Sequence, residues 1–202
     1  MERSPKDRLF LWKAGALVNF AMDLEQVYIC TRLSGSSTFF LPFNMGCGEG
    51  IQVGAGNPIL KDNYSVHYMW DDILQKDSLL EILGKFMFIE VSEKEDASGK
   101  AKKKETVIFP RYHQLDVVRK LLADVEVHGS SLNYLLQHSA GSGKTNEIAW
   151  LAHRLASLHN ADNIIIFDYI IICTDRVVVD RQLQQAVLGL SLIHISEPTR
   201  HA

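Results

Sequence analysis

The amino-acid sequence predicts an α/β protein whose C-terminal half contains a parallel sheet. Two apolar runs, Tyr134–Leu136 and Ile164–Thr174, lie on either side of a segment with helical apolar spacing from Ile148 to Leu158. A further helix is predicted from Val177 to Val187. Strands that alternate with helices favour a parallel sheet covered by helices. The N-terminal half carries short β-type runs and one helical pattern, which predicts an α+β region.

The composition is that of a folded protein with a buried core. Of the 202 residues, 47% are hydrophobic, and the formal net charge is −3. This balance gives no overall basic field, so contact with nucleic acid has to come from local patches. Cys30, Cys47 and Cys173 lack metal-binding or disulfide spacing, which favours a reducing compartment. We therefore expect a cytoplasmic protein without a membrane-spanning segment.

Residues 1–91 form the first predicted region. Runs rich in aromatic or β-branched residues predict strands at Ala16–Ala21, Val27–Arg32 and Thr38–Leu41. The glycine-rich stretch Met45–Pro58 lacks the pattern G-x-G-x-x-G and predicts a surface loop. Asp71–Phe86 predicts a helix, and a strand follows from Phe86 to Val91. Asp71 and Asp72 suit the helix macrodipole, and capping is favoured over metal ligation.

Residues 92–105 break this composition, because nine of the fourteen are charged. Such a segment buries too little apolar area to offset its ordering entropy, which predicts a solvated linker between two domains. Lys102, Lys103 and Lys104 fit this solvated run, and contact with a phosphate backbone is the alternative.

The second domain is predicted to cover residues 106–189. It begins with a short strand, Val107–Phe109, and a helix that opens at Arg111. Apolar residues share one face of this helix, namely Leu115, Val118, Leu121 and Leu122. Gln114 has two open interpretations: an amide that reads adenine through paired hydrogen bonds, or an exposed glutamine at a helix start.

The segment HSAGSGKT, from His138 to Thr145, predicts a phosphate-binding loop. Its middle consists of small residues that let main-chain N–H groups curl around a phosphate: Ser139, Ala140, Gly141, Ser142 and Gly143. Lys144 is expected to reach the β- and γ-phosphates, and the Thr145 hydroxyl to ligate Mg²⁺. His138 stands where the strict pattern G-x-x-x-x-G-K-[ST] has its first glycine. Binding of a nucleoside triphosphate is the strongest prediction from the sequence.

Two further segments need an interpretation. Asp168 follows an apolar run, as does the Mg²⁺-holding acid of many phosphate-loop proteins, but it precedes the longer run Tyr169–Cys173. We interpret Asp168 as a strand-edge or loop residue. The segment LSLIHISEPTR within Leu190–Ala202 resembles a translated sequencing adapter, so we expect residues 190–202 to be a non-native tail.

Three segments together resemble the motor region of type I restriction enzyme R subunits: FPRYHQLDVVRKL, LLQHSAGSGKTNEIAWLAHRLASLH and IICTDRVVVDRQL. Upstream, WDDILQKDSLLEILGKF and the segment from Leu9 to Asn44 resemble the part that joins nuclease to motor. The resemblance runs in order from Lys6 to Val187. These subunits are superfamily-two helicase-like ATPases that translocate duplex DNA. The resemblance implies the end of a nuclease region followed by the first part of a RecA-like, parallel-sheet P-loop motor domain.

By this resemblance Gln114 senses adenine, residues 138–145 bind ATP with Mg²⁺, and Lys144 and Thr145 serve catalysis. Arg176 and Arg181 match the motif after the second motor strand and become candidate contacts to DNA phosphates, with helix-surface salt bridging as the alternative. The implied partners are duplex DNA and the methyltransferase and specificity subunits of a restriction complex.

Parts of the family's machinery are missing from the sequence. It contains no D-E dipeptide for a DExx box and no E-x-K nuclease pair. The resemblance places these residues upstream of Met1 and beyond Gly189. We expect a fragment that is inactive alone, from an ATP-hydrolysing type I site-specific deoxyribonuclease. The alternatives are a non-catalytic P-loop nucleotide-binding regulatory module and a superfamily-two helicase without a nuclease.

Overall fold

The computed structural model describes residues 7–47, 55–95, 101–175 and 177–194; the side chains of residues 93–102, 176–181 and 191–202 lie outside this description. The chain divides into two compact units, residues 1–113 and 114–202. Helices and small antiparallel sheets make up the described part, which confirms a mixed α and β protein. No helix among the described residues has both the length and the apolar character needed to cross a membrane.

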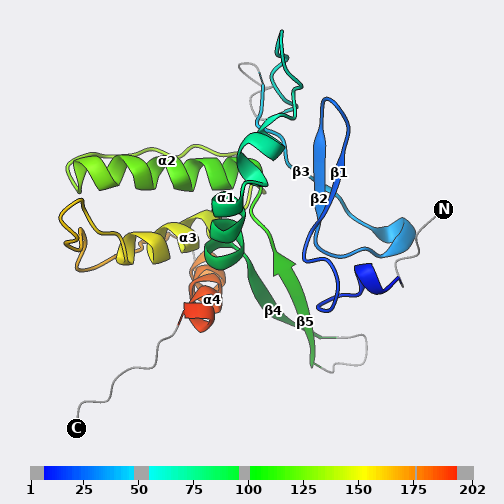
Figure 1. The fold of residues 1–202 in the computed structure, drawn as a ribbon. Coiled ribbons are helices and arrows are strands. Elements are labelled where there is room, and N and C mark those ends of the chain that lie inside the picture. Colours follow the sequence, from blue (N-terminus) through cyan, green and yellow to red (C-terminus); the bar gives the residue numbers. More distant parts are fainter. Residues whose placement is uncertain (1–6, 48–54, 96–100, 176, 195–202) are drawn as a thin grey trace. The chain divides into compact units, whose positions relative to one another are not determined.

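The first unit contains an antiparallel sheet in the order β1-β2-β3 (Figure 1). Its strands are β1 (Asn19–Met22), β2 (Val27–Cys30) and β3 (Leu41–Pro42). β1 and β2 overlap the strands predicted at Ala16–Ala21 and Val27–Arg32, which are confirmed. The strand predicted at Thr38–Leu41 shares only Leu41 with β3, because residues 38–40 have no regular secondary structure. A short 3₁₀ helix at Arg8–Phe10 precedes β1, and a second at Gly35–Ser37 lies between β2 and β3.

The turn between β1 and β2 is set by Asp23. Its carboxylate accepts the main-chain N–H of Glu25 at 2.8 Å and that of Gln26 at 2.7 Å. These hydrogen bonds stabilise the ionised form, so they hold the pKa of Asp23 below its usual value. An aspartate that bonds the next main-chain groups reproduces a turn by itself, which explains why the two strands meet in this register.

The core of the first unit is an aromatic cluster around Phe43, which is fully buried. The ring centroids of Phe20, Phe109 and Tyr112 lie 5.8, 6.0 and 5.9 Å from that of Phe43. The Tyr68 hydroxyl donates to the Phe43 carbonyl at 2.5 Å. Burial raises the pKa of Tyr68, because the phenolate loses its hydration there.

A buried asparagine, Asn57, fixes the described ends of the predicted glycine-rich loop through hydrogen bonds. Asn57 accepts the N–H of Met45 at 2.8 Å and donates to the carbonyl of Glu25 at 2.8 Å and to the Asn44 side chain at 2.9 Å. The described parts of the stretch, residues 45–47 and 55–58, contain neither helix nor strand. Residues 48–54 of the predicted loop lie outside the described residues.

The helix predicted over Asp71–Phe86 is interrupted. A π-helix at Met69–Ile73 is followed by α1 (Lys76–Glu81) and a second π-helix at Ile82–Phe86. Continuity fails at Gln75, whose backbone is extended at φ −64° and ψ 144°. Asp71 and Asp72 lie in the first turn of the π-helix, as the macrodipole favours, but neither this helix nor α1 has a side-chain cap hydrogen bond. The Asp72 carboxylate instead accepts the Ser78 hydroxyl at 3.1 Å.

β4 (Phe88–Glu95) and β5 (Ala101–Ile108) pair as antiparallel strands (Figure 1). Residues 92–95 and 101–105 were expected in a solvated linker but lie in these strands. Each of the two strands supplies hydrogen-bond partners for the main-chain N–H and C=O groups of the other. Charged side chains do not prevent this main-chain pairing. In register Glu93 stands opposite Lys103 but Lys94 stands opposite Lys102, so charge alone does not account for the pairing. Residues 96–100 lie outside the described residues.

The second unit is built on three helices: α2 (Tyr112–His128, which starts just before the boundary), α3 (Lys144–Ala156) and α4 (Val177–His194). The predicted apolar face of α2 is confirmed, with Leu115, Val118 and Leu122 buried. Helix α3 packs on α4, and the His153 ring donates to the Val187 carbonyl at 2.8 Å. Helix α4 continues through Leu190, which is buried, to His194.

The parallel sheet predicted for the second unit is not formed. Residues 132–139 and 166–174 have no regular secondary structure, and the described residues contain no parallel strand pair. The one bridge here joins His159 and Ile165 in antiparallel sense. Leu135, Tyr169 and Ile171 are 84–88% exposed. A strand needs a neighbour along its length to satisfy its main-chain groups. Among the described residues these apolar runs have only the bridge at Ile165 and the hydrogen bond from the Ile166 N–H to the Leu158 carbonyl at 3.0 Å.

Candidate functional site

The segment from His138 to Thr145 forms a tight loop that leads into α3. Gly141 and Gly143 have φ of +76° and +90°, a region that side chains with Cβ atoms rarely adopt. Gly143 is the N-cap, and α3 begins at Lys144. The first N–H groups of such a helix have no acceptor within the helix. The predicted order of loop and helix is therefore confirmed, although the expected strand before it is absent.

The Lys144 side chain folds back across the loop. Its ammonium nitrogen Nζ donates to the carbonyl of His138 at 3.0 Å and to that of Ser139 at 2.7 Å. The side chain remains exposed. The lysine thus places a positive charge at the mouth of the loop, next to the start of α3. Thr145 is half-buried in the first turn of that helix.

Gln114, from α2, holds the other end of the loop. It is only 3% exposed, and its amide nitrogen donates to the carbonyls of Ser142 and Gly143, each at 3.1 Å. The interpretation of Gln114 as an exposed helix-start residue is therefore wrong. A role in sensing adenine stays a prediction. What the geometry adds is a second function for this amide, the support of the loop backbone.

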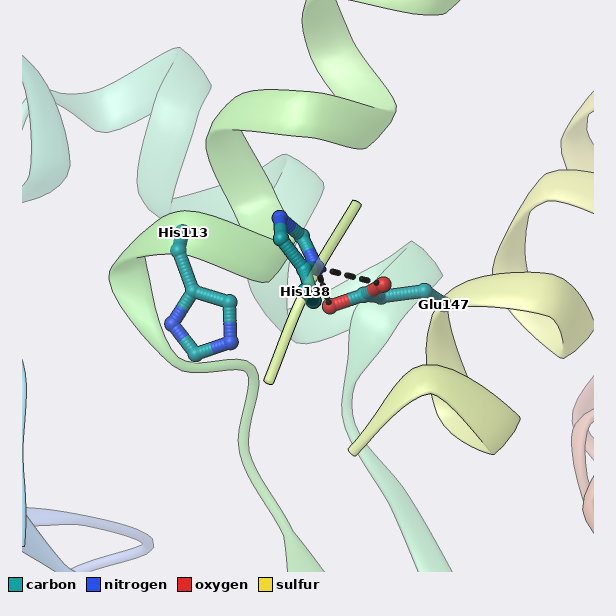
Figure 2. A group of neighbouring side chains, drawn as sticks. All are labelled: His113, His138 and Glu147. Carbon is teal, nitrogen blue, oxygen red and sulfur yellow. Dashed lines mark hydrogen bonds and ion pairs between the residues drawn. The ribbon is translucent and has the colours of Figure 1, made fainter. Parts of the chain in front are cut away.

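His138, the departure from the strict pattern, is bound to Glu147. Its ring nitrogen Nδ1 lies 2.9 and 3.0 Å from the two carboxylate oxygens of Glu147 (Figure 2). The side chains are 22% and 3% exposed. A carboxylate only accepts, so Nδ1 carries the proton of this hydrogen bond. Sequence reasoning missed Glu147, because an acid in the first turn of a helix is common and the nine-residue separation is not a local pattern.

The chain before the loop is attached to α2 through a tyrosine. The Tyr134 hydroxyl donates to the Asp124 carboxylate at 2.6 Å. This hydrogen bond holds the proton on the phenol and raises the pKa of Tyr134. Tyr134 was predicted to begin a strand. In the structure it instead anchors irregular chain to the helix that also supplies Gln114.

The other residues discussed as candidates from the sequence are not part of the loop at residues 138–145. Asp168 is exposed on irregular chain, in agreement with its interpretation as a loop residue. Arg176 lies outside the described residues. Arg181 is in α4, but its side chain is not described, so its contact with DNA stays a prediction. Lys103 and Lys104 are exposed on β5.

Chemically, the loop combines the features of an anion site. The N-terminal end of a thirteen-residue helix, an ammonium group and a threonine hydroxyl come from the consecutive residues 143–145, and the ammonium lies at the carbonyls of His138 and Ser139. Oriented N–H groups and the helix dipole both favour negative charge at this point. The Thr145 hydroxyl is the group in the loop suited to Mg²⁺, a hard cation that prefers oxygen ligands.

Comparisons with known proteins gave no match of any kind: no protein-family model, no curated protein and no solved structure is significantly similar to the chain. The function must therefore be inferred from the loop and its contacts.

Proposed function

We propose that residues 138–145 bind the polyphosphate of a nucleoside triphosphate, ATP, together with Mg²⁺. The observation that carries the proposal is the position of Lys144, whose ammonium bonds the His138 and Ser139 carbonyls across a loop curled by two left-handed glycines. A phosphate oxygen is a stronger partner than a neutral carbonyl, since hydrogen bonds between ionised groups are shorter and stronger. The lysine needs to move little to exchange one for the other.

The proposal extends to the whole protein through the resemblance to type I restriction R subunits. In that wider proposal the chain is a fragment of the ATP-dependent, DNA-translocating endonuclease subunit, which works with duplex DNA and with methyltransferase and specificity subunits in the cytoplasm. The exposed apolar runs around Leu135 and Ile171 support it, because apolar residues of this kind are suited to the strands of a RecA-like parallel sheet. Such a sheet would require further strands.

The irregular backbone at residues 166–174 favours a second candidate, a nucleotide-binding regulatory module without catalysis. The carboxylate in the first turn of α3, Glu147, is engaged by His138. In this candidate the loop senses a nucleotide without cleaving it. The two candidates differ in the reading frame of the source gene: continuation into a DExx box with an upstream E-x-K pair favours the R subunit.

Calorimetric titration of the 202-residue chain with MgATP tests the shared claim. Lys144→Ala should weaken binding at least about tenfold, since a hydrogen bond to a charged group contributes roughly 1.5–3 kcal/mol. Lys120→Ala is the matched control, because Lys120 is an exposed lysine on α2 that pairs with Asp116 at 2.8 Å. Equal affinity of wild type and Lys144→Ala would remove the loop from the proposal. Robust ATP turnover by this chain would contradict an inactive fragment.

A further inference from the structure

The first residue of the loop is held in two ways at once. The His138 ring is bonded to both carboxylate oxygens of Glu147, at 2.9 and 3.0 Å. The main-chain carbonyl of the same residue accepts the Lys144 ammonium at 3.0 Å. Lys144 and Glu147 belong to the first turn of α3, three residues apart. His138 is therefore joined to both ends of this helix turn, through its carbonyl to Lys144 and through its ring to Glu147. Figure 2 shows the contact between His138 and Glu147.

We propose that the His138–Glu147 pair is a positioning device, which fixes the first residue of the phosphate loop against α3 and so sets the place of the Lys144 ammonium. The expected effect on ligand affinity rests on the proposed nucleotide binding, whereas the contacts of His138 with Glu147 and Lys144 do not. Neither residue contacts phosphate in this scheme. Both act through the His138 carbonyl, one of the two that hold the lysine.

Burial makes this pair a strong constraint. The Glu147 side chain is 3% exposed, and a carboxylate removed from water must be hydrogen-bonded. The hydrogen bond between Glu147 and His138 therefore opens less readily than an exposed ion pair. Lys120 and Asp116 on α2 form such an exposed pair, in which the lysine side chain is 75% exposed. A loop held at this point is preorganised, so less ordering is needed when a ligand binds.

The inference gives His138 a role that the strict sequence pattern does not. His138→Gly restores the first glycine of G-x-x-x-x-G-K-[ST]. From the sequence pattern alone, this substitution would be expected to improve phosphate binding. The positioning role predicts the opposite, because glycine removes the ring that reaches Glu147. Glu147→Gln tests the same link from the other side, since an amide has one acceptor oxygen in place of two.

The experiment has two readouts on the full chain. The first is MgATP affinity. The second is amide hydrogen exchange at residues 138–145 without nucleotide. Both His138→Gly and Glu147→Gln should weaken MgATP binding and accelerate loop exchange, each by about threefold to tenfold, the effect of one net hydrogen bond. Exchange at the centre of α2 should stay unchanged. His138→Gln, whose amide can still donate, should recover part of both effects, and Asp116→Asn is the matched surface control.

The outcomes separate the two proposals. Wild-type affinity and exchange in both variants would overturn the positioning role, while loss of binding in Lys144→Ala would leave the proposed function standing. If the wild type binds no MgATP, the proposed function fails, and loop exchange alone decides the inference. Should the variants not fold, ¹⁵N spectra of the wild-type His138 ring decide it: a protonated, slowly exchanging Nδ1 supports the pair, and an unprotonated Nδ1 overturns it.

Discussion

Gly143→Ala is the substitution for which the structure gives the sharpest expectation. Gly143 has φ of +90°, and a Cβ placed there would stand 2.3 Å from the Gln114 amide nitrogen and 3.4 Å from its Cδ. The amide is the end of a side chain and can move, but it is buried and makes two hydrogen bonds to the loop. To admit the methyl group, Gln114 must give up those bonds.

The expected loss in the free energy of unfolding has two parts. The left-handed backbone costs an alanine roughly 1–2 kcal/mol. The displaced Gln114 loses two hydrogen bonds, which contribute about 1 kcal/mol each. We therefore expect Gly143→Ala to destabilise the protein by about 3–4 kcal/mol, adding these two contributions.

Gly141→Ala is the matched control. Its φ of +76° imposes comparable backbone strain, but nothing lies within 4 Å of where the alanine Cβ would stand. It should cost only roughly 1–2 kcal/mol. Urea denaturation of both variants, and of Gly143→Ala in a Gln114→Ala background, measures the difference. The reasoning is refuted if Gly143→Ala is no more destabilising than Gly141→Ala, or if its cost is unchanged once Gln114 is removed.

Three further predictions concern stability and titration. Because Tyr68 has a raised pKa in the folded protein, its contribution to stability is complete below the pKa of tyrosine in the unfolded chain and is lost as the pH rises above that value. Denaturation at increasing alkaline pH should show this loss. The variant Tyr68→Phe should lack the part that Tyr68 contributes. Asp124→Asn should lower the pKa of Tyr134 toward its ordinary value, which the ultraviolet absorbance of the phenolate measures. An unchanged titration would mean that the hydrogen bond of 2.6 Å between Tyr134 and Asp124 is not made in solution. Asn57→Ala should cost about 2–3 kcal/mol in urea denaturation, because the buried Asn57 loses three partly buried hydrogen bonds. A cost below that of an average surface substitution would count against the network.

Local patterns predicted much of the first unit. β1, β2 and β3 lie where aromatic and β-branched runs are interrupted by polar residues, and Asp23 supplies its own turn. The paired strands β4 and β5 were predicted only at their outer ends, as strands at Phe86–Val91 and Val107–Phe109, because the charge density of residues 92–105 was taken to mean a linker. The two arms pair residue by residue, with Glu93 opposite Lys103, and a pattern of that kind appears only when both arms are aligned.

The candidate site was predicted in its chain order but not in its contacts. Helical spacing and small residues placed the loop before α3, and the glycines adopt the backbone that such a loop requires. The burial of Gln114 and the pairing of His138 with Glu147 depend on tertiary packing, so spacing along the chain does not reveal them. The apolar run at Ile164–Thr174 predicts a strand by composition, yet a strand forms only beside a partner.

The central claim is that the backbone of residues 139–145 meets a polyphosphate. The most direct measurement is a residue-resolved one: ¹H–¹⁵N spectra of the chain during titration with MgATP, repeated with Lys144→Ala. We predict that the largest shifts fall on the amides of Gly141, Gly143, Lys144 and Thr145, and that they vanish in the variant. Shifts centred elsewhere, or an unchanged loop at saturating MgATP, would contradict the claim.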